Sequence, residues 1–448
     1  MKLYDTQSRG LKQAAGADGT LSIYCCGPTV YRDAHVGNLR TFMLADLISR
    51  VSALSGVKVT LIQNITDVGH MSEDFTGDDK ILSQASLEKV SPLEIARKYE
   101  EKFHDDLAQL NIGKAHAYPR ASESIELMQS MIGELIEREF AYIGGDKTVY
   151  FDAQKFVSYG SISGNRLDSL IPGHKFENHN DGAKKFHADW ALWKAAGDRT
   201  EMIWDSPWGP GFPGWHIECS AMSMDMLDKQ VDVHVGGIDL RFPHHENERA
   251  QSNAVIGHEA VDLWVHGEHL LFEGKKMSKS SGNVVLVSDI TARGIDPLAL
   301  RLCFLENRYR SQMDLTWNSI NAADETIKRW RTKMSAWRMS SEIIIDSEIE
   351  SAFNNDLDTP KVILRLREIE KSDLRNKREV FLYADQVLGL DLDRPIAERE
   401  LTEHMQTLLD DRMKARSEKR WSESDELRIQ LENLGLQIKD TAEGQIWS

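Results

Sequence analysis

Cysteine is scarce in this sequence of 448 residues, which contains only Cys25, Cys26, Cys219 and Cys303. Four scattered cysteines are too few for a disulfide framework in a chain of this length. We therefore expect reduced thiols, which could act as ligands of a metal ion.

Long apolar runs are also missing. No stretch approaches the ~20 apolar residues that a membrane-spanning helix needs, and the first five residues lack the apolar core of a signal peptide. With 41% hydrophobic and 28% charged residues, the composition is that of a soluble globular protein, and the length suggests roughly two to four domains. We expect a cytoplasmic protein with no membrane partner.

An excess of positive charge is absent as well, since the formal net charge is −17. This balance argues against indiscriminate nucleic-acid binding, although local basic patches can still bind RNA. Two basic groups occur in the last third of the chain, namely Lys361, Arg365, Arg367, Lys371, Arg375, Lys377 and Arg378, and Arg412, Lys414, Arg416, Lys419 and Arg420. Helix faces with ion pairs are the more frequent explanation of such groups, and RNA contacts are the alternative.

Near the N-terminus the sequence contains a strand–helix–strand pattern. Residues 21–25 are typical of a buried strand, apolar residues recur at helical spacing between Leu44 and Leu54, and residues 57–62 form a second, β-branched strand. Such a unit indicates a parallel sheet, and ligands bind beyond the carboxyl ends of its strands. The segment Cys26–Asn38 is therefore expected at the mouth of a site.

The rest of the chain is less regular. Residues 112–194 have a mixed pattern and are interpreted as an insertion. A pattern typical of strands resumes near Trp204, with a strand predicted at 231–235. Past Asn318, apolar residues recur mainly at helical spacing. The predicted fold class is α/β, with a Rossmann-type parallel-sheet domain that carries an insertion, followed by a helical bundle and a small C-terminal domain.

Two segments suit a nucleotide. His35-Val36-Gly37-Asn38 lies at a predicted helix N-terminus, where backbone N–H groups and the helix dipole favour phosphate, and Gly37 permits close approach. The second segment, Lys276-Met277-Ser278-Lys279-Ser280, is a cationic loop that can neutralise charge on departing pyrophosphate. Each alone also fits an ordinary surface loop. Together, and in this order, they resemble the HIGH and KMSKS signatures of class I aminoacyl-tRNA synthetases.

Four scattered residues form a plausible zinc set, namely Cys26, Cys219, His244 and Glu248. His244 and Glu248 are four residues apart, so on a helix they share a face. The short Cys-x-x-Cys spacing of structural zinc sites is missing. From spacing alone, buried cysteines and a capping histidine therefore remain the more frequent explanation.

Longer strings resemble those of cysteinyl-tRNA synthetases over essentially the whole chain. They are Tyr24–Tyr31, Asn64–Asp67, Gly214–Met222, Gly236–Leu240, Phe242–Glu248 and Tyr309–Gln312. The resemblance implies one zinc ion per chain, held by Cys26, Cys219, His244 and Glu248, with the sulfur of the substrate L-cysteine as a further ligand. It also implies ATP, accompanied by Mg²⁺, as co-substrate and tRNA(Cys) as acceptor and partner of a monomeric enzyme.

The same resemblance implies the roles of the remaining site residues. Thr66, Trp215 and His234 match positions that line the cysteine pocket, Gly237 and Asp239 the nucleoside-binding turn, and His35, Gly37, Asn38 and Lys279 the ATP site. His35, Asn38, Lys276 and Lys279 are the expected catalytic residues. The implied domains are a catalytic domain in two halves (1–111 and 201–270), a connective insertion (112–200), a KMSKS-loop and stem-contact region (271–317), a helical tRNA-binding bundle (318–396) and an anticodon-binding domain (397–448).

Physical reasoning supports a metal in such an enzyme. Serine and cysteine have nearly the same shape, and a pocket that senses size alone discriminates by only ~1–3 kcal/mol. Zinc prefers a thiolate, so selection by the metal makes an editing domain unnecessary, and residues 112–194 contain no recognisable one.

Three positions depart from the family pattern. Asn38 replaces the last histidine of the HIGH signature, and its amide can still donate a hydrogen bond. The segment 68–79 is longer and more acidic than in many members, and no role is assigned to it. Cys25, next to a proposed ligand, stands where the family often has an apolar residue, and its side chain is expected to be part of the buried core.

Two other functions remain open at this stage. A relative from mycothiol synthesis makes the same cysteinyl adenylate but passes it to an amino sugar and lacks the tRNA-reading end. Residues 412–428 resemble an anticodon-binding region, which disfavours this reading. An inactive RNA-binding paralogue is disfavoured because both signatures and all four candidate ligands are present.

Overall fold

A computed structural model describes residues 1–14, 16, 19–68, 79–170, 183–277, 283–338, 344–395, 402–434, 436, 438–441 and 444–447. They form two compact units, Met1–Asp393 and Arg394–Ser448. In this described part of the chain, no helix is both long and apolar enough to cross a membrane.

The first unit is built on a four-stranded parallel sheet in the order β10–β9–β3–β4. Its strands are β3 (Thr20–Cys25), β4 (Lys58–Gln63), β9 (Val231–Gly237) and β10 (Val261–Gly267). The chain passes from β3 to β4 on one side and from β9 to β10 on the other. The carboxyl ends of β3 and β9 therefore form a switch point, where open α/β sheets bind ligands. The expected parallel sheet is confirmed.

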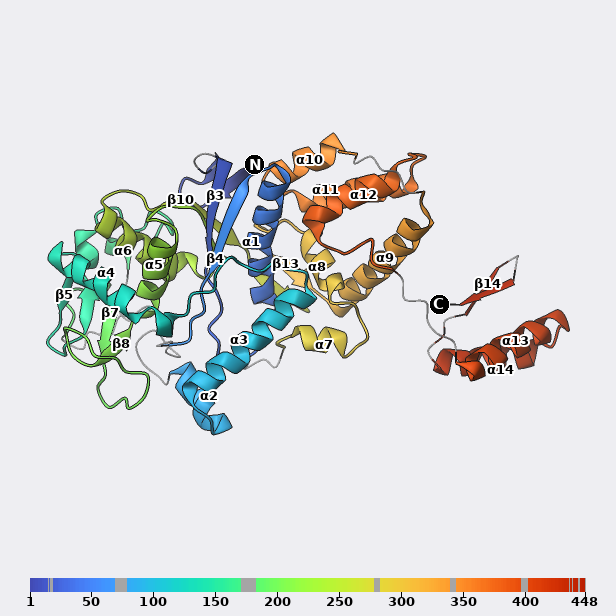
Figure 1. Ribbon diagram of the computed structural model, residues 1–448, viewed down its shortest axis with the longest axis horizontal. Coiled ribbons are helices and arrows are strands. Elements are labelled where there is room, and N and C mark those ends of the chain that lie inside the picture. The colour runs from blue at the N-terminus through green and yellow to red at the C-terminus, as the bar shows by residue number, and fades with distance from the viewer. Residues whose placement is uncertain are drawn as a thin grey trace. The chain divides into compact units, whose positions relative to one another are not determined.

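Helices cover both faces of this sheet. Leu21 and Ile23 of β3 pack in the same core as α1 (Val36–Leu54), whereas Tyr24 packs with α5 (Trp215–Met226) and α6 (Glu246–Ile256). Figure 1 shows α1 on one side of β3 and β4, and α5 and α6 on the other. Because both faces of the sheet are covered, apolar side chains of its strands are buried on either side. A hairpin of β1 (Lys2–Asp5) and β2 (Gly10–Gln13) precedes the sheet.

The segment between β4 and β9 contributes residues to both of these hydrophobic cores. Its helices are α2 (Lys80–Glu88), α3 (Pro92–Gln109) and α4 (Ile125–Glu137), with short 3₁₀ turns at Ala121–Glu123, Ala153–Lys155 and Leu167–Ser169. Its antiparallel strands pair in the order β5 (Ala141–Ile143), β6 (Val149–Phe151), β7 (Trp190–Ala195) and β8 (Gly211–Pro213). Trp190 stacks on Phe151 with ring centroids 4.4 Å apart. The sequence predicted an insertion here but not this sheet.

Past β10 the first unit becomes mainly helical, and the helical region expected past Asn318 is confirmed. A small sheet comprises β11 (Leu270–Phe272), β12 (Lys275–Lys276) and β13 (Met313–Leu315). The helices are α7 (Val287–Thr291), α8 (Leu298–Leu305), α9 (Trp317–Ala336), α10 (Ser347–Asn354), α11 (Thr359–Lys371) and α12 (Lys377–Leu388). The predicted apolar face of α9 is buried at Ile327, Trp330 and Met334.

A buried arginine fixes the helical region against the sheet. Arg301 of α8 donates to the Asp46 carboxylate of α1 at 2.7 Å and to the carbonyls of Leu110 and Leu388. Its guanidinium also lies 2.9 Å from where a Cβ would stand on Gly389, which has a φ of +63°. Only glycine meets both the backbone conformation and the close approach.

The second unit is a helical hairpin with a small sheet. It consists of α13 (Glu403–Ser417), α14 (Trp421–Asn433), β14 (Ile438–Thr441) and β15 (Gly444–Trp447). Leu408, Leu431 and Leu436 are in its core. Arg412 is buried and donates to the Asp440 carboxylate at 3.0 Å. Arg412, which belongs to the second basic group in the sequence, therefore stabilises the fold of this unit.

Candidate active site and metal centre

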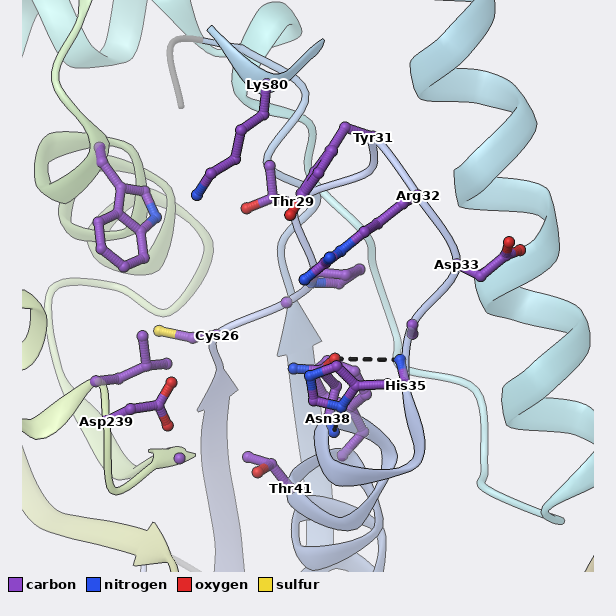
Figure 2. A pocket seen from close by; sticks show the side chains of 17 residues that line it. Cys26, Thr29, Tyr31, Arg32, Asp33, His35, Asn38, Thr41, Lys80 and Asp239 are labelled. Carbon is purple, nitrogen blue, oxygen red and sulfur yellow. Dashed lines mark hydrogen bonds between the residues drawn. The ribbon is translucent and has the colours of Figure 1, made fainter. Parts of the chain in front are cut away.

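The N-terminus of α1 positions two side chains of the first signature. His35 is the N-cap, and its Nδ1 accepts from the backbone N–H of Asn38, while the Asn38 Oδ1 accepts from the backbone N–H of His35, both at 3.3 Å. Figure 2 shows one of these hydrogen bonds. Because Nδ1 is an acceptor, the proton of a neutral His35 ring lies on Nε2. The capping box therefore leaves the His35 Nε2–H and the Asn38 NH₂ as donors.

The two signature segments meet at Gly37. A Cβ on this residue would lie 2.9 Å from the Met277 Cε and 3.1 Å from the His35 ring. On the far side of the second signature, the Val285 carbonyl accepts from the Val36 N–H at 3.0 Å. The chain therefore enters and leaves this loop against the start of α1. Lys279 lies outside the described residues, and Lys276 is exposed on β12.

A cavity of about 320 Å³ opens at the carboxyl ends of β3 and β9. Its lining includes Cys26, Thr29, Arg32, His35, Asn38, Lys80, Trp215, Gly237 and Asp239. Figure 2 shows Cys26 on one side of this space and His35 with Asn38 on another. At the tip of β9, a Cβ on Gly237 would lie 2.4 Å from the Asp239 Oδ1, so a larger residue there would displace the Asp239 side chain. The volume falls within the range of small-molecule sites.

The four proposed zinc ligands lie together beside this cavity. The Cys26 and Cys219 sulfurs are 3.9 Å apart, the His244 Nε2 lies 2.9 Å from the Glu248 Oε1, and that oxygen lies 3.6 Å from the Cys26 Sγ. All four ligand atoms are within 4.8 Å of one another, and all four residues are buried. His244 belongs to the irregular turn Arg241–His245 that precedes α6, so the pair meets across a helix start rather than along one regular helix.

A second set of donors overlaps the first. It combines Cys26 and Glu248 with His234 and His245. The His234 Nε2 and the His245 Nε2 each lie 3.4 Å from the Cys26 Sγ. The sequence assigned His234 to the cysteine pocket and did not single out His245. The adjacent His244-His245 pair was the signal that could have identified it.

Further histidines support the inner ones. The His244 Nδ1 lies 2.9 Å from the His216 Nδ1, and the His245 Nδ1 lies 2.8 Å from the His266 Nε2. Hydrogen bonds of this kind fix the tautomer and the orientation of a ligand imidazole. Burial lowers the pKa of His266 to about 3, which keeps this outer histidine neutral.

The donor set fits a divalent cation. Burial raises the pKa of Glu248 well above its ordinary value, and its Oε2 has no hydrogen-bond partner. The hydrogen bond from Cys26 lowers the pKa of Cys219 to about 7. Within the described part of the chain, no lysine or arginine forms an ion pair with Glu248. A buried acid beside two thiols and neutral imidazoles matches the ligand chemistry of zinc.

The other predicted pocket residues adjoin this cluster. The Trp215 ring stacks on His244 with centroids 4.2 Å apart and also lines the cavity. Thr66 is buried and does not belong to the cavity lining, and the buried Glu218 nearby has a pKa raised well above its ordinary value. Burial is the main cause of that raised pKa, followed by the charges of Cys219 and Asp67. The sequence did not identify Glu218 as part of this region.

Comparisons with known proteins agree with this geometry. Residues 13–325 match the family described as tRNA synthetases class I (C) catalytic domain, and residues 398–447 match the cysteinyl-tRNA ligase anticodon binding domain. The cysteine–tRNA ligase of Thermus thermophilus is 38% identical over 99% of this chain and 98% of its own length. That of Deinococcus radiodurans is 35% identical over 99% and 96%.

A solved structure shares the fold. The methionyl-tRNA synthetase of Mycobacterium tuberculosis, in complex with methionyl-adenylate, superposes with a TM-score of 0.55 at 14% identity, covering 83% of this chain and 90% of that one. At this identity the likeness concerns the fold alone. The family matches and the full-length relatives show that the chain belongs to the cysteine–tRNA ligases, within the class I aminoacyl-tRNA synthetases.

Proposed function

We propose that this cysteine–tRNA ligase activates L-cysteine with ATP and selects it by its thiol, at a zinc ion held by Cys26, Cys219, His244 and Glu248. The observation that supports this most directly is the buried cluster of these four residues. It reaches the cavity through Cys26, which is both a member of the cluster and part of the cavity lining. A substrate sulfur in the cavity would thus lie beside the metal.

The first ligand set is the better choice for zinc. It contains two thiols, which zinc favours, whereas the alternative set of Cys26, His234, His245 and Glu248 contains one. Cys219 also has the lowered pKa that a thiolate ligand needs. When bound, zinc supplies a ligand position that favours a thiolate over a hydroxyl. This preference adds to the ~1–3 kcal/mol that pocket shape alone provides.

The chain's own residues would hold the other groups of the reaction. His35 and Asn38 would donate to the phosphates of ATP at the start of α1, and Gly237 with Asp239 would receive the nucleoside. Thr66, Trp215 and His234 would enclose the cysteine, with Lys276 and Lys279 on the closing loop. Mg²⁺ would accompany the phosphates. Positioning and charge stabilisation then suffice, without a nucleophilic side chain.

The reaction proceeds in two balanced steps. The cysteine carboxylate attacks the α-phosphate, which forms cysteinyl adenylate and releases pyrophosphate. A terminal ribose hydroxyl of tRNA(Cys) then attacks the acyl carbon of this mixed anhydride and loses its proton. AMP leaves with the bonding electrons of the broken acyl–phosphate bond, and the cysteine remains on the tRNA as an ester. Residues 397–448, with the helical bundle of 318–396, would bind the tRNA, and a monomer would suffice.

Two adjacent cysteines offer a matched test of the zinc site. Cys25 and Cys26 are both buried, but only Cys26 is in the cluster, whereas the Gln63 side-chain amide donates to the Cys25 Sγ at 3.7 Å. Cys26→Ser should lose most of the one zinc per chain and raise the KM for cysteine by about tenfold or more. Cys25→Ser should retain both properties. Metal analysis and cysteine-dependent ATP–pyrophosphate exchange measure them.

Further variants separate the two ligand sets. Cys219→Ser should lose zinc, while His245→Ala should retain more of it. The reverse order would favour the alternative set. If the zinc-loaded enzyme itself shows no cysteine-dependent exchange, the proposed activity is wrong.

A further inference from the structure

The phosphate end of the cavity contains little permanent positive charge near the first signature. The His35 Nδ1 accepts a hydrogen bond, and burial followed by the charge of Arg32 lowers the pKa of His35, so this ring is neutral. Asn38, where the signature has a second histidine, carries an amide that cannot be protonated. ATP nevertheless brings several negative charges to this place, and class I chemistry increases the charge on the departing pyrophosphate.

Arg32 is a cation in the right position. It lies in the loop between β3 and α1 and lines the cavity together with His35 and Asn38. Figure 2 shows its side chain extending from this loop into the space between Cys26 and His35. Its guanidinium carbon lies 5.1 Å from the centroid of the Tyr31 ring, which supports it from one side.

No carboxylate neutralises this guanidinium. Arg32 forms no ion pair among the residues that the structure describes, and the adjacent Asp33 is paired instead with Lys102 of α3 at 2.9 Å. The other permanent cation of the lining is Lys80, whose Nζ lies 5.8 Å from the Tyr31 centroid. Of the two, Arg32 is the one close enough to His35 to affect its ionisation.

We propose that Arg32 binds the phosphates of ATP and supplies the positive charge that Asn38 cannot provide in the first signature. A guanidinium is charged at every relevant pH, and its planar fork suits two phosphate oxygens at once. The inference rests on the proposed ATP-dependent function and adds a phosphate-binding residue to it.

The test measures cysteine-dependent ATP–pyrophosphate exchange at varied ATP and varied cysteine. We expect Arg32→Ala to lower kcat/KM for ATP by about 10- to 100-fold, with zinc content and the KM for cysteine unchanged. Arg32→Lys should recover part of the loss, since it restores the charge without the fork. Lys114→Ala is the control, because it removes an exposed positive charge that does not line the cavity and leaves the Asp33–Lys102 pair intact, and it should have little effect.

Rescue distinguishes phosphate binding from a structural role. Asn38→His should restore part of the exchange rate in the Arg32→Ala background, because a second imidazole can contact phosphate there. Arg32→Gln serves as a second variant, with thermal unfolding as the check on folding. If exchange by Arg32→Ala and Arg32→Gln keeps the original kcat/KM for ATP, or if both lose cysteine affinity to the same extent, Arg32 does not bind phosphate. Absence of exchange in the unmodified enzyme would instead refute the proposed function itself.

Discussion

Asp106 is a single residue whose charge opposes folding at neutral pH. It is half-buried in α3, and burial, followed by the charges of Asp33 and Asp105, raises its pKa to about 7. In the unfolded chain the pKa of an aspartate is about 3.9. The native state therefore binds this proton at higher pH than the unfolded state. The ionised form costs stability above about pH 7, and the cost diminishes as the pH falls towards about 4.

Asp106→Asn should therefore stabilise the protein in a pH-dependent way. We expect the free energy of unfolding to rise by about 1–2 kcal/mol at pH 8, a figure reduced for partial exposure to solvent. The gain should shrink steadily between about pH 7 and pH 4. Urea unfolding at several pH values measures it. The exposed Asp198 provides the control, since Asp198→Asn removes a carboxylate outside this group and should show only a small change. An equal gain from Asp106→Asn at every pH would contradict the explanation.

At the residue scale, the sequence predicted only part of the buried cluster of candidate metal ligands. Cys26, Cys219, His244 and Glu248 could be nominated because their residue types match zinc and their surroundings resemble a known family. His245 and His266 could not, because their contact depends on β10 passing beside the turn before α6, at 2.8 Å between ring nitrogens. Such a contact depends on the tertiary fold and leaves no short spacing in the sequence.

At the scale of elements, local pattern determined what could be foreseen. The strands β3 and β4 and the helix α1 follow one another directly, so their periodicity alone predicted a parallel unit. The insertion strands β5, β6 and β8 have three residues each, and β6 pairs with β7 across a long stretch of chain. A segment of three residues is too short to show the alternation of apolar and polar residues that identifies a strand. Pairing between strands that are distant in the sequence cannot be recognised from a short stretch of sequence.

The start of α1 provides a test of how the two signature segments depend on each other. Gly37→Ala would place a methyl group 2.9 Å from the Met277 Cε and 3.1 Å from the His35 ring. Met277 or His35 must then shift, and a small displacement of such groups can cost about 100-fold in rate. We therefore expect ATP–pyrophosphate exchange to fall by about 10- to 100-fold, while the melting temperature changes little.

Gly133→Ala is the control for this variant. Gly133 lies within α4, and a Cβ there would meet nothing within 4 Å. Alanine should stabilise that helix by up to about 1 kcal/mol and leave exchange unchanged. If Gly37→Ala is as active as Gly133→Ala, close packing of Met277 on α1 is unimportant for catalysis.

At the scale of the whole molecule, the acidic net charge must be reconciled with an RNA substrate. Several basic residues of the C-terminal third form ion pairs within the protein, as their pattern suggested. Examples are Arg365 with Asp346, Arg378 with Asp393 and Arg412 with Asp440. These arginines stabilise the fold, so the total charge says little about tRNA binding. Residues 398–447 match the anticodon-binding domain of the family, so the net charge of −17 does not exclude RNA contacts there.

Removing residues 394–448 should therefore separate the two half-reactions. The cavity and the cluster of candidate metal ligands both consist of residues of the compact unit Met1–Asp393. We expect the truncated enzyme to keep cysteine-dependent ATP–pyrophosphate exchange within about threefold, because the groups that act on the phosphates are retained. Loading of tRNA(Cys) should fall by about 100-fold or more, since an anticodon contact supplies binding energy remote from the reacting centre. Equal loading by the full-length and truncated chains, or transfer of cysteine to an amino sugar by either, would show that the acceptor is not recognised through this unit.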